Sequence, residues 1–260
     1  MINESQKTKS AGDVDYTVHG IGYAQQRQTD PRIAHFVELA IGDARTVLNV
    51  GAGAGSYESV DRHFIAVEPS SAMRAQRPRH LSPAIRGIAE DLPLDDQSVD
   101  ASMASVTIHQ WSDVDKGISE LKRVTRGPIV ILTFDGDALD RFWLNHYCPE
   151  VIEAERKRYP KIEWLCDRLG GIVDCQAVQI PIDCLDGFTE AFYARPERFL
   201  NDSVRRSQSA WTFIPAEDQT RAMKKLANDL ESGEWDRQFG FLRRQPSFEG
   251  SLHLIISNHR

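Results

Sequence analysis

The sequence predicts an α/β protein with a doubly wound, Rossmann-like sheet, and three observations support this prediction. Short β-rich runs alternate with helical patterns across residues 30–135, a glycine-rich turn follows the first run, and an acidic residue ends the second. Strands that alternate with helices form parallel sheets with right-handed crossovers. Ligand sites of such sheets lie at the carboxyl ends of the strands, so functional residues are expected there.

The first elements follow from capping residues and from short apolar runs. A helix is predicted from Pro31, because Asp30 is a favourable N-cap residue and proline suits the first helical position. Apolar residues then repeat at helical spacing until Gly42, which is a typical helix stop. The runs 46–50 and 64–67 are short, apolar and bounded by turn residues, and they predict the first two strands.

The next elements complete the sheet. Residues 100–106 predict a third strand, and Ser112 is expected to cap the helix that follows it. The run 129–134 is continuously apolar, as in a strand that is buried on both faces. Two further strands are predicted near residues 172–182 and 251–257, and the remainder beyond residue 135 is mostly helical.

These patterns divide the 260-residue chain into three parts. Residues 1–14 are predicted to form a polar tail, and residues 15–183 together with 246–260 the sheet-containing core. Residues 184–245 are predicted to form a helical cap over the carboxyl edge of the sheet. This length suits one large domain or a core with a cap, since about 100 to 200 residues per domain is usual.

Composition restricts the class of protein and its partners. The chain has 31 basic and 38 acidic side chains, a net charge of −7 that does not favour a nucleic-acid partner. No apolar run approaches the roughly 18 residues of a membrane span, and no signal peptide is visible. The four cysteines lack metal-ligand spacing and are expected to be reduced. We therefore expect a cytoplasmic protein without a metal or a membrane partner.

A glycine turn and a carboxylate predict a nucleotide cofactor. Gly51, Gly53 and Gly55 let the main chain approach a ligand closely, and Glu68 can accept hydrogen bonds from both hydroxyls of a ribose. A nicotinamide-dependent oxidoreductase uses the same two features, but its G-x-G-x-x-G motif would require glycine or alanine where Ser56 stands. No Tyr-x-x-x-Lys pair supports that alternative. A structural glycine turn beside a solvated glutamate is the third interpretation.

Five ordered segments resemble the successive motifs of class I S-adenosylmethionine-dependent methyltransferases. The resemblance is to the group similar to the ubiquinone and menaquinone biosynthesis C-methyltransferases, which carry a type 11 methyltransferase domain. A Tyr23–Arg27 segment is similar to the family's entry segment. The five segments are Val47–Gly55, Val67–Pro69, Ala89–Leu94, Ser98–Asp100 and Glu120–Val124.

The resemblance implies a sheet of about seven strands and a cofactor site for S-adenosyl-L-methionine. It implies that the three glycines face the methionine part and the ribose, that Glu68 holds the ribose, and that Ala89 and Glu90 contact the adenine edge. The remaining cofactor residues implied are Tyr23, Arg27, Asn49, Ala52, Pro69 and Thr107. Asn49 departs from the family, which usually has aspartate there, and the lost negative charge is expected to weaken cofactor binding.

Methyl transfer from a sulfonium mainly requires alignment of the nucleophile with the methyl group in a dry pocket. A base helps when the nucleophile carries a proton, and His109 follows the third strand at its carboxyl end. His146 is the second candidate, and a structural role is the alternative for each histidine. Aromatic residues in the cap, such as Phe142 and Phe188, either line a small-molecule pocket or fill the core of the cap.

The predicted function is transfer of a methyl group from S-adenosylmethionine to an O, N or C nucleophile of a small molecule. Besides the oxidoreductase, one further alternative remains, a protein of this fold that binds the cofactor without methyl transfer or uses the pocket for other chemistry.

Overall fold

The computed structural model describes residues 23–258, so the predicted polar tail lies outside the described residues. Six strands form the central sheet in the order β2-β1-β3-β4-β8-β5. The first four are parallel, whereas β8 pairs antiparallel with both β4 and β5. Their bounds are β1 Thr46–Val50, β2 His63–Val67, β3 Ala101–Ser105, β4 Ile129–Phe134, β5 Ile172–Ala177 and β8 Leu252–Asn258. The doubly wound α/β prediction is confirmed.

A single bridged residue extends the sheet beyond β2. Ile85 pairs with Val67 as an isolated parallel bridge. The Ile85 N–H donates to Ala66 O at 2.8 Å, and the Glu68 N–H donates to Ile85 O at 3.0 Å. Pro83, two residues earlier, has no N–H to donate to a ladder. The sheet therefore has six full strands and one bridged residue, close to the seven strands that the resemblance implies.

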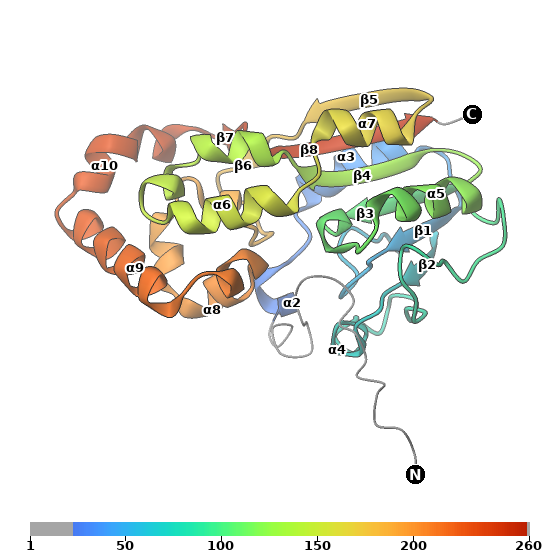
Figure 1. The fold of residues 1–260 in the computed structure, drawn as a ribbon, viewed down its shortest axis with the longest axis horizontal. Helices are drawn as coiled ribbons and strands as arrows, with labels where there is room; N and C mark the ends of the chain where they lie inside the picture. The colour runs from blue at the N-terminus through green and yellow to red at the C-terminus, as the bar shows by residue number, and fades with distance from the viewer. Residues whose placement is uncertain (1–22, 259–260) are drawn as a thin grey trace, which may run out of the picture.

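Helices cover both faces of the sheet (Figure 1). Helix α3 (Pro31–Ile41) packs on one face, and helices α5 (Val114–Val124) and α7 (Ile162–Leu169) lie on the other. Helix α3 begins as predicted, because the Asp30 carboxylate accepts the Arg32 N–H at 3.0 Å. It ends at Gly42, which has a φ of 63°. The Asp30, Pro31 and Gly42 signals are therefore confirmed.

The cap of helix α5 differs from the prediction by one residue. Asp113 is the N-cap, and its carboxylate accepts the Lys116 N–H at 3.0 Å. Ser112 is engaged elsewhere, since its hydroxyl donates to Glu90 Oε1 at 2.8 Å. The prediction that Ser112 caps this helix was therefore wrong, because a carboxylate at the next position supplies the cap.

A second, mostly helical lobe adjoins the carboxyl edge of the sheet (Figure 1). The helical elements of residues 136–158 and 178–250 lie together on this side of the sheet (Figure 1), and the predicted bounds of the core and of the cap stay a prediction. The elements of the lobe after β4 are η2 Gly136–Arg141, η3 Trp143–His146 and α6 Pro149–Arg158. Those after β5 are β6 Ile180–Pro181, η4 Thr189–Phe192, η5 Pro196–Leu200, α8 Asp202–Arg206, η6 Ser209–Phe213, α9 Ala216–Glu231, α10 Glu234–Phe239, η7 Gly240–Arg244 and β7 Ser247–Phe248. Strands β6 and β7 pair antiparallel.

Aromatic side chains fill the interior of this cap. The Trp143 ring lies 5.6 Å from the rings of both Phe199 and Trp235, and all three side chains are buried. The Trp143 indole N–H donates to Tyr193 O at 3.0 Å, so its polar atom is satisfied. Most aromatic residues of the cap therefore pack in its core. Of the two roles that the sequence leaves open for them, core packing is the one observed.

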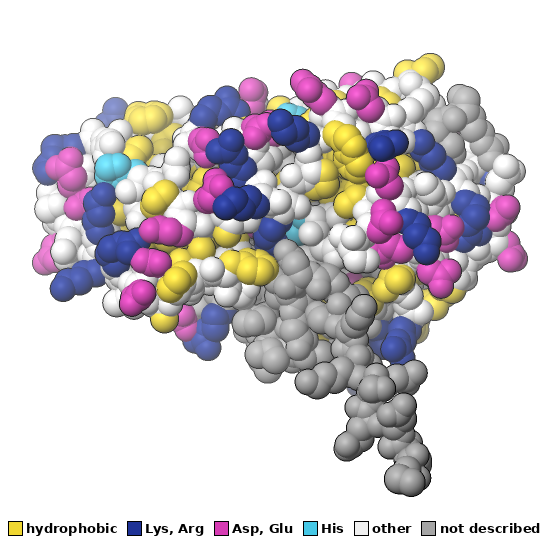
Figure 2. Space-filling view, in the orientation of Figure 1, with side chains coloured by type: hydrophobic (Ala, Val, Ile, Leu, Met, Phe, Trp, Pro, Cys, Tyr) yellow, Lys and Arg dark blue, Asp and Glu magenta, His cyan; other side chains and the backbone are white. Residues whose placement is uncertain are grey.

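Charge is mixed over the surface. Figure 2 shows basic and acidic side chains interspersed across the face seen there. None of the helices between residues 23 and 258 combines the length and the apolarity that a membrane crossing requires. Cys148, Cys166, Cys175 and Cys184 are all free thiols.

Candidate functional site

The glycine turn is fastened to the ends of two neighbouring strands. The N–H groups of Gly51 and Ala52 both donate to Val67 O at the end of β2, at 2.9 and 3.1 Å. Gly51 has a φ of 66°, and a Cβ atom there would lie 2.0 Å from Thr107 Oγ1. Only glycine fits at this position, because a side chain would collide with Thr107, two residues beyond the end of β3.

Glu68 is held against the turn by the main chain. Its Oε2 accepts the Gly53 N–H at 2.9 Å, and its Oε1 accepts the Ser70 N–H at 2.8 Å. Burial raises the pKa of Glu68, while these hydrogen bonds and the charges of Arg74 and Arg77 oppose the rise. The carboxylate is 6% exposed, so it is anchored at the carboxyl end of β2 beside the glycines. Pro69, which follows it, accepts a hydrogen bond from Arg74 through its carbonyl.

Asn49 lies beneath the turn in a buried polar network. Its Nδ2 donates to Glu58 Oε1 at 2.9 Å, and Glu58 forms an ion pair of 2.6 Å with Arg77. The Asn49 side chain is buried, and within residues 23–258 its Oδ1 has no hydrogen-bond partner. An aspartate at this position would place a second carboxylate against Glu58. The departure from the family motif therefore has a local electrostatic reason.

Glu90 has partners that the sequence pattern did not anticipate. Its Oε1 accepts the Ser112 N–H at 2.6 Å, the Ser112 hydroxyl at 2.8 Å and the Asp113 N–H at 3.1 Å. This carboxylate thereby ties the segment after β2 to the start of α5. Ala89, beside it, is buried. Contacts of these two residues with an adenine ring stay a prediction.

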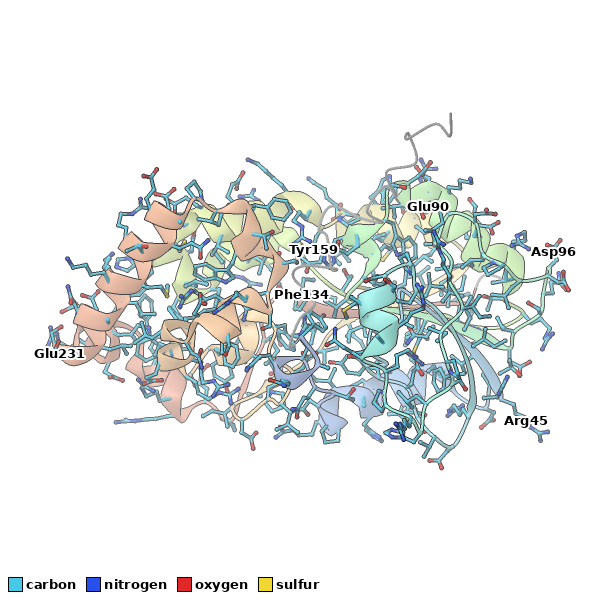
Figure 3. All side chains as sticks on the ribbon, turned by 90° about the horizontal axis from the view of Figure 1, so that it is seen from below. Arg45, Glu90, Asp96, Phe134, Tyr159 and Glu231 are labelled. Carbon is cyan, nitrogen blue, oxygen red and sulfur yellow. The ribbon has the colours of Figure 1, made fainter. Side chains whose placement is uncertain are left out.

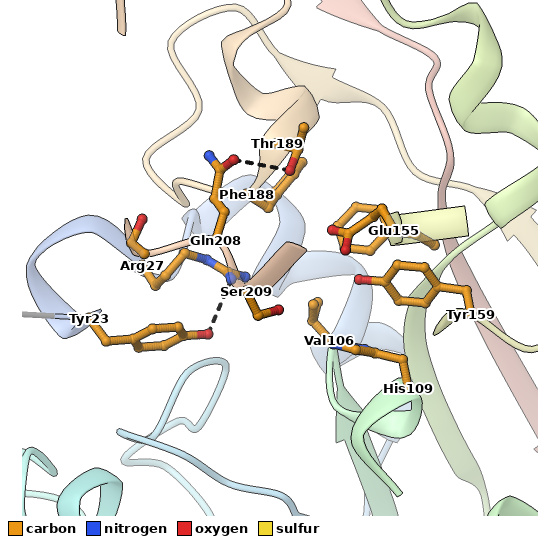
Figure 4. Close-up of a pocket in the computed structure, with 12 residues that line it drawn as sticks. Tyr23, Arg27, Val106, His109, Glu155, Tyr159, Phe188, Thr189, Gln208 and Ser209 are labelled. Atoms are coloured by element: carbon orange, nitrogen blue, oxygen red, sulfur yellow. Dashed lines mark hydrogen bonds between the residues drawn. The ribbon is translucent and has the colours of Figure 1, made fainter. Parts of the chain in front are cut away.

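A small pocket lies where the sheet meets the cap. Val106, His109 and Phe134 line it from the carboxyl ends of β3 and β4. Phe134 and Tyr159 lie at this junction, whereas Glu231 is at the far end of the cap (Figure 3). The cap and the segment before it contribute Glu155, Tyr159, Phe188, Thr189, Gln208 and Ser209 to the wall (Figure 4).

Backbone strain is concentrated at the sheet side of this pocket. Val106 has a φ of 51°, a conformation that is strongly unfavourable for a β-branched residue. Its N–H donates to Leu132 O at 2.7 Å, which holds the strained residue in place. Strain of this kind is typical of functional sites, and here it directs the chain from β3 toward Thr107 and His109.

Tyr23 and Arg27, predicted to contact the cofactor, lie in the wall of this pocket (Figure 4). The Arg27 guanidinium lies 5.4 Å from the centre of the Tyr23 ring, and its Nη1 donates to the Tyr23 hydroxyl at 3.1 Å. Its Nε forms an ion pair of 2.5 Å with Asp186. The structure therefore places both residues between the glycine turn and the cap.

His109 is the histidine that the structure brings to the pocket. Its ring lies 4.5 Å from the Tyr159 ring, and its Nε2 lies 2.9 Å from Gln110 Nε2. Burial lowers the pKa of His109 well below its usual value, and the charges of Arg158 and Arg27 lower it further. The imidazole is therefore neutral near pH 7 and suited to hydrogen bonding with a bound molecule.

His146 is remote from this group. Its side chain is exposed on the cap, where Nε2 lies 3.1 Å from Lys225 Nζ and the ring lies 6.0 Å from the ring of Phe239. It does not line the pocket with His109. The geometry gives His146 a place in the packing of the cap, so its predicted catalytic role has no support in the structure.

Several residues of the pocket were missed from the sequence, among them Phe134, Glu155 and Tyr159. A signal existed for Tyr159, because it precedes Pro160 and a residue before proline is disfavoured in a helix. Pro160 thus ends α6, and the Tyr159 ring lies beside Phe134, with 5.4 Å between the ring centres. No comparable local pattern marks Glu155 within its helix.

Comparisons with known proteins agree with this architecture. Residues 48–128 match the model of a methyltransferase domain. An uncharacterized methyltransferase of Mycobacterium tuberculosis is 41% identical over 91 residues, which are 32% of this chain and 36% of the relative. The match thus spans about a third of that relative's length. The geranyl diphosphate C-methyltransferase of Streptomyces coelicolor shares the fold, with a TM-score of 0.50, 15% identity and coverage of 88% and 79% of the two chains.

A crystal structure from Anabaena variabilis is similar over nearly the whole chain. That protein, assigned as a methyltransferase of an antibiotic biosynthesis pathway, has a TM-score of 0.84 and 29% identity. The similarity covers 90% of this chain and 99% of that one, so it includes the cap as well as the sheet. Together with the glycine turn beside Glu68, these matches show that residues 48–128 are similar to a methyltransferase domain and that the fold of the chain is similar to that of a protein assigned as a methyltransferase.

Proposed function

We propose that the protein transfers the methyl group of S-adenosylmethionine to an O, N or C nucleophile of a small molecule bound in the pocket between sheet and cap. The observation that carries this proposal is the contact of Thr107 with Gly51. Thr107 packs on the glycine turn, while Val106 and His109 on either side of it line the pocket. A cofactor on the turn and an acceptor in the pocket would therefore meet at residues 106–109.

The residues of the turn fit the adenosyl cofactor. Gly51 and Gly53 give the turn its positive φ angles of 66° and 52°, and Glu68 presents an anchored carboxylate toward the turn. The buried Oδ1 of Asn49 is an acceptor for which residues 23–258 supply no donor. We infer that Glu68 holds the ribose hydroxyls and that Asn49 lies under the amino-acid part. The sulfonium supplies a methyl group whose transfer releases a neutral thioether.

The pocket residues bind and orient the acceptor. The Phe134 ring lies 5.4 Å from the Tyr159 ring and 5.3 Å from the Phe188 ring, so one wall of the pocket is aromatic. His109, neutral for the reasons given above, would accept a hydrogen bond from a hydroxyl or an amine of the acceptor. The expectations of no nucleic-acid partner and of a cytoplasmic location remain predictions.

Turnover tests this function directly. The full chain would be incubated with S-adenosylmethionine and a panel of small phenols, amines and enolisable carbonyl compounds, and S-adenosylhomocysteine would be measured by mass spectrometry. We expect product that depends on an acceptor. Binding of S-adenosylhomocysteine without any turnover across the panel would favour a cofactor-binding protein, and saturable binding of NADH in its place would favour the oxidoreductase.

A further inference from the structure

Three segments that are distant in the sequence meet at the buried carboxylate of Asp186. Its Oδ2 accepts the Tyr57 hydroxyl at 2.9 Å, and its Oδ1 pairs with Arg27 Nε at 2.5 Å. The Asp186 side chain is 2% exposed. Tyr57 lies within the loop between β1 and β2 that begins with the glycine turn. Arg27 follows helix α2 (Tyr23–Gln26), and Asp186 belongs to the cap.

Tyr57 requires this support because its backbone is strained. It has a φ of 65°, a region that side chains with a Cβ rarely adopt, and it is buried. Its N–H donates to Thr29 Oγ1 at 2.9 Å, and its hydroxyl is anchored on Asp186. Burial and the charge of Asp186 raise the pKa of Tyr57 well above its usual value, so the phenol stays protonated and can donate.

On its other side, Asp186 reaches the acceptor pocket. Arg27 and Asp186 form an isolated antiparallel bridge, and the Gly187 N–H donates to Gln26 O at 3.0 Å. Arg27 lines the pocket, as do Phe188 and Thr189, which follow Asp186 by two and three residues. The carboxylate is therefore bonded to the glycine loop through Tyr57 and to the pocket wall through Arg27.

We propose that Asp186 is a positioning residue that couples the conformation of the glycine loop to that of the acceptor pocket. Through it, ordering of loop 51–58 also orders the pocket wall at residues 23–28 and 186–189. The proposal deepens the proposed function, since it assumes that the loop serves the cofactor and the pocket the acceptor. It predicts that a substitution at one end of the Tyr57–Asp186–Arg27 chain of contacts changes the backbone dynamics at the other end.

Hydrogen exchange measured by mass spectrometry tests the coupling without any ligand. Tyr57→Phe removes one hydroxyl and the bond to Asp186. The matched control is Tyr147→Phe, because Tyr147 is also buried and its hydroxyl donates to the carboxylate of Asp229 at 3.0 Å, within the cap. We expect Tyr57→Phe to accelerate amide exchange at least threefold both in residues 51–58 and in residues 23–28. We expect the control to change neither segment.

Acceleration confined to residues 51–58, or absent from both segments, would overturn the proposal. Asp186→Asn provides the second variant, and its faster exchange at both segments should match that of Tyr57→Phe. Equal acceleration in the Tyr147→Phe control would also count against the proposal, because the effect would then come from general loosening of the fold.

A binding cycle extends the test to the cofactor site. The affinity for S-adenosylhomocysteine would be measured for Arg27→Gln, for Tyr57→Phe and for the double variant. We expect at least a fivefold loss in each single variant and no further loss in the double variant. Losses that multiply would place Arg27 in direct contact with the cofactor and contradict the coupling. Failure of the wild-type chain to bind would instead refute the proposed function, and the exchange experiment would still decide the role of Asp186.

Discussion

A Cβ atom added to Gly51 would lie 2.0 Å from Oγ1 of Thr107, so the ends of β1 and β3 are in direct contact. Glycine is required at position 51 for two reasons: Thr107 lies too close for a side chain, and the backbone has a φ of 66°. The contact also brings the segment that carries His109 next to the glycine turn. The relationship between Gly51 and Thr107 thus sets the geometry of the whole site.

Gly51→Ala is expected to lower the free energy of unfolding more than Gly42→Ala does. Both glycines have similar positive φ angles, 66° and 63°, but a Cβ on Gly42 would meet nothing within 4 Å. The control, in which Gly42 has a ψ of −135° that lies outside the left-handed helical region, should cost about 1 to 3 kcal/mol from backbone strain alone. The collision with Thr107 should add about 1 to 3 kcal/mol. Urea denaturation measures the free energy of unfolding of each variant. Equal destabilisation of the two variants would show that Thr107 moves aside without an energetic cost.

Asn49→Asp is expected to destabilise the protein, because it places a carboxylate beside Glu58 in a buried network. A loss on the order of 3 kcal/mol is expected from an uncompensated buried charge. In the double variant with Glu58→Gln, one negative charge remains for Arg77, and most of the stability should return. Unfolding in urea provides the measurement. Lack of recovery in the double variant would mean that charge is not the reason for asparagine at this position.

The pH dependence of turnover should show no step near pH 6.5 from His109. Burial, then the charges of Arg158 and Arg27, lower the pKa of His109, so the folded protein keeps this imidazole neutral across the neutral pH range. His109→Gln should reduce turnover through loss of a ring nitrogen while leaving the affinity for S-adenosylhomocysteine nearly unchanged. A step near pH 6.5 in kcat/KM that disappears in His109→Gln would contradict this description of the pocket.

Glu190 should make stability fall as the pH rises. Burial raises the pKa of this carboxyl from 4.5 to about 7, although its Oε2 accepts the Ser251 N–H at 2.9 Å. The fold thus favours the protonated form. The stability that Glu190 contributes is complete below pH 4.5 and is lost between pH 4.5 and about 7, as the unfolded chain ionises first. The loss should be on the order of 3 kcal/mol.

Glu190→Gln separates this effect from other titrations, since the amide keeps the shape of the side chain and cannot ionise. Urea denaturation at pH 5 and at pH 8 should show a smaller difference between the two pH values for the variant than for the wild type. The same difference in both proteins would show that Glu190 ionises in the fold without cost.

Local sequence signals predicted the fold well where a single residue or run has only one structural interpretation. Asp30, Pro31 and Gly42 mark both ends of α3, and the continuous apolar run of β4 identified a strand buried on both faces. The Ser112 prediction failed because two adjacent polar residues could both serve as the cap. The choice between them depends on Glu90, which arrives from a distant segment and takes up Ser112.

The site was only partly predictable from the sequence, because some of its residues are brought together by contacts between distant segments. The glycines and Glu68 carry a motif with fixed spacing, and the structure brings them together. Asp186 has no such motif, because its partners Arg27 and Tyr57 are 159 and 129 residues away in the sequence. His146 illustrates the opposite case, in which a residue of suitable chemistry near a strand end is carried onto the outside of the cap.

The central claim is that the turn at residues 51–55 and the carboxylate of Glu68 bind the adenosyl cofactor, and calorimetric titration with S-adenosylhomocysteine tests it most directly. The wild-type chain should bind saturably. Glu68→Ala should lose more than tenfold in affinity, about 1.4 kcal/mol, because charge-assisted hydrogen bonds to the ribose are removed. Glu231→Ala, at the exposed far end of the cap, should bind as the wild type does. Equal affinity for Glu68→Ala and the wild type would contradict the claim.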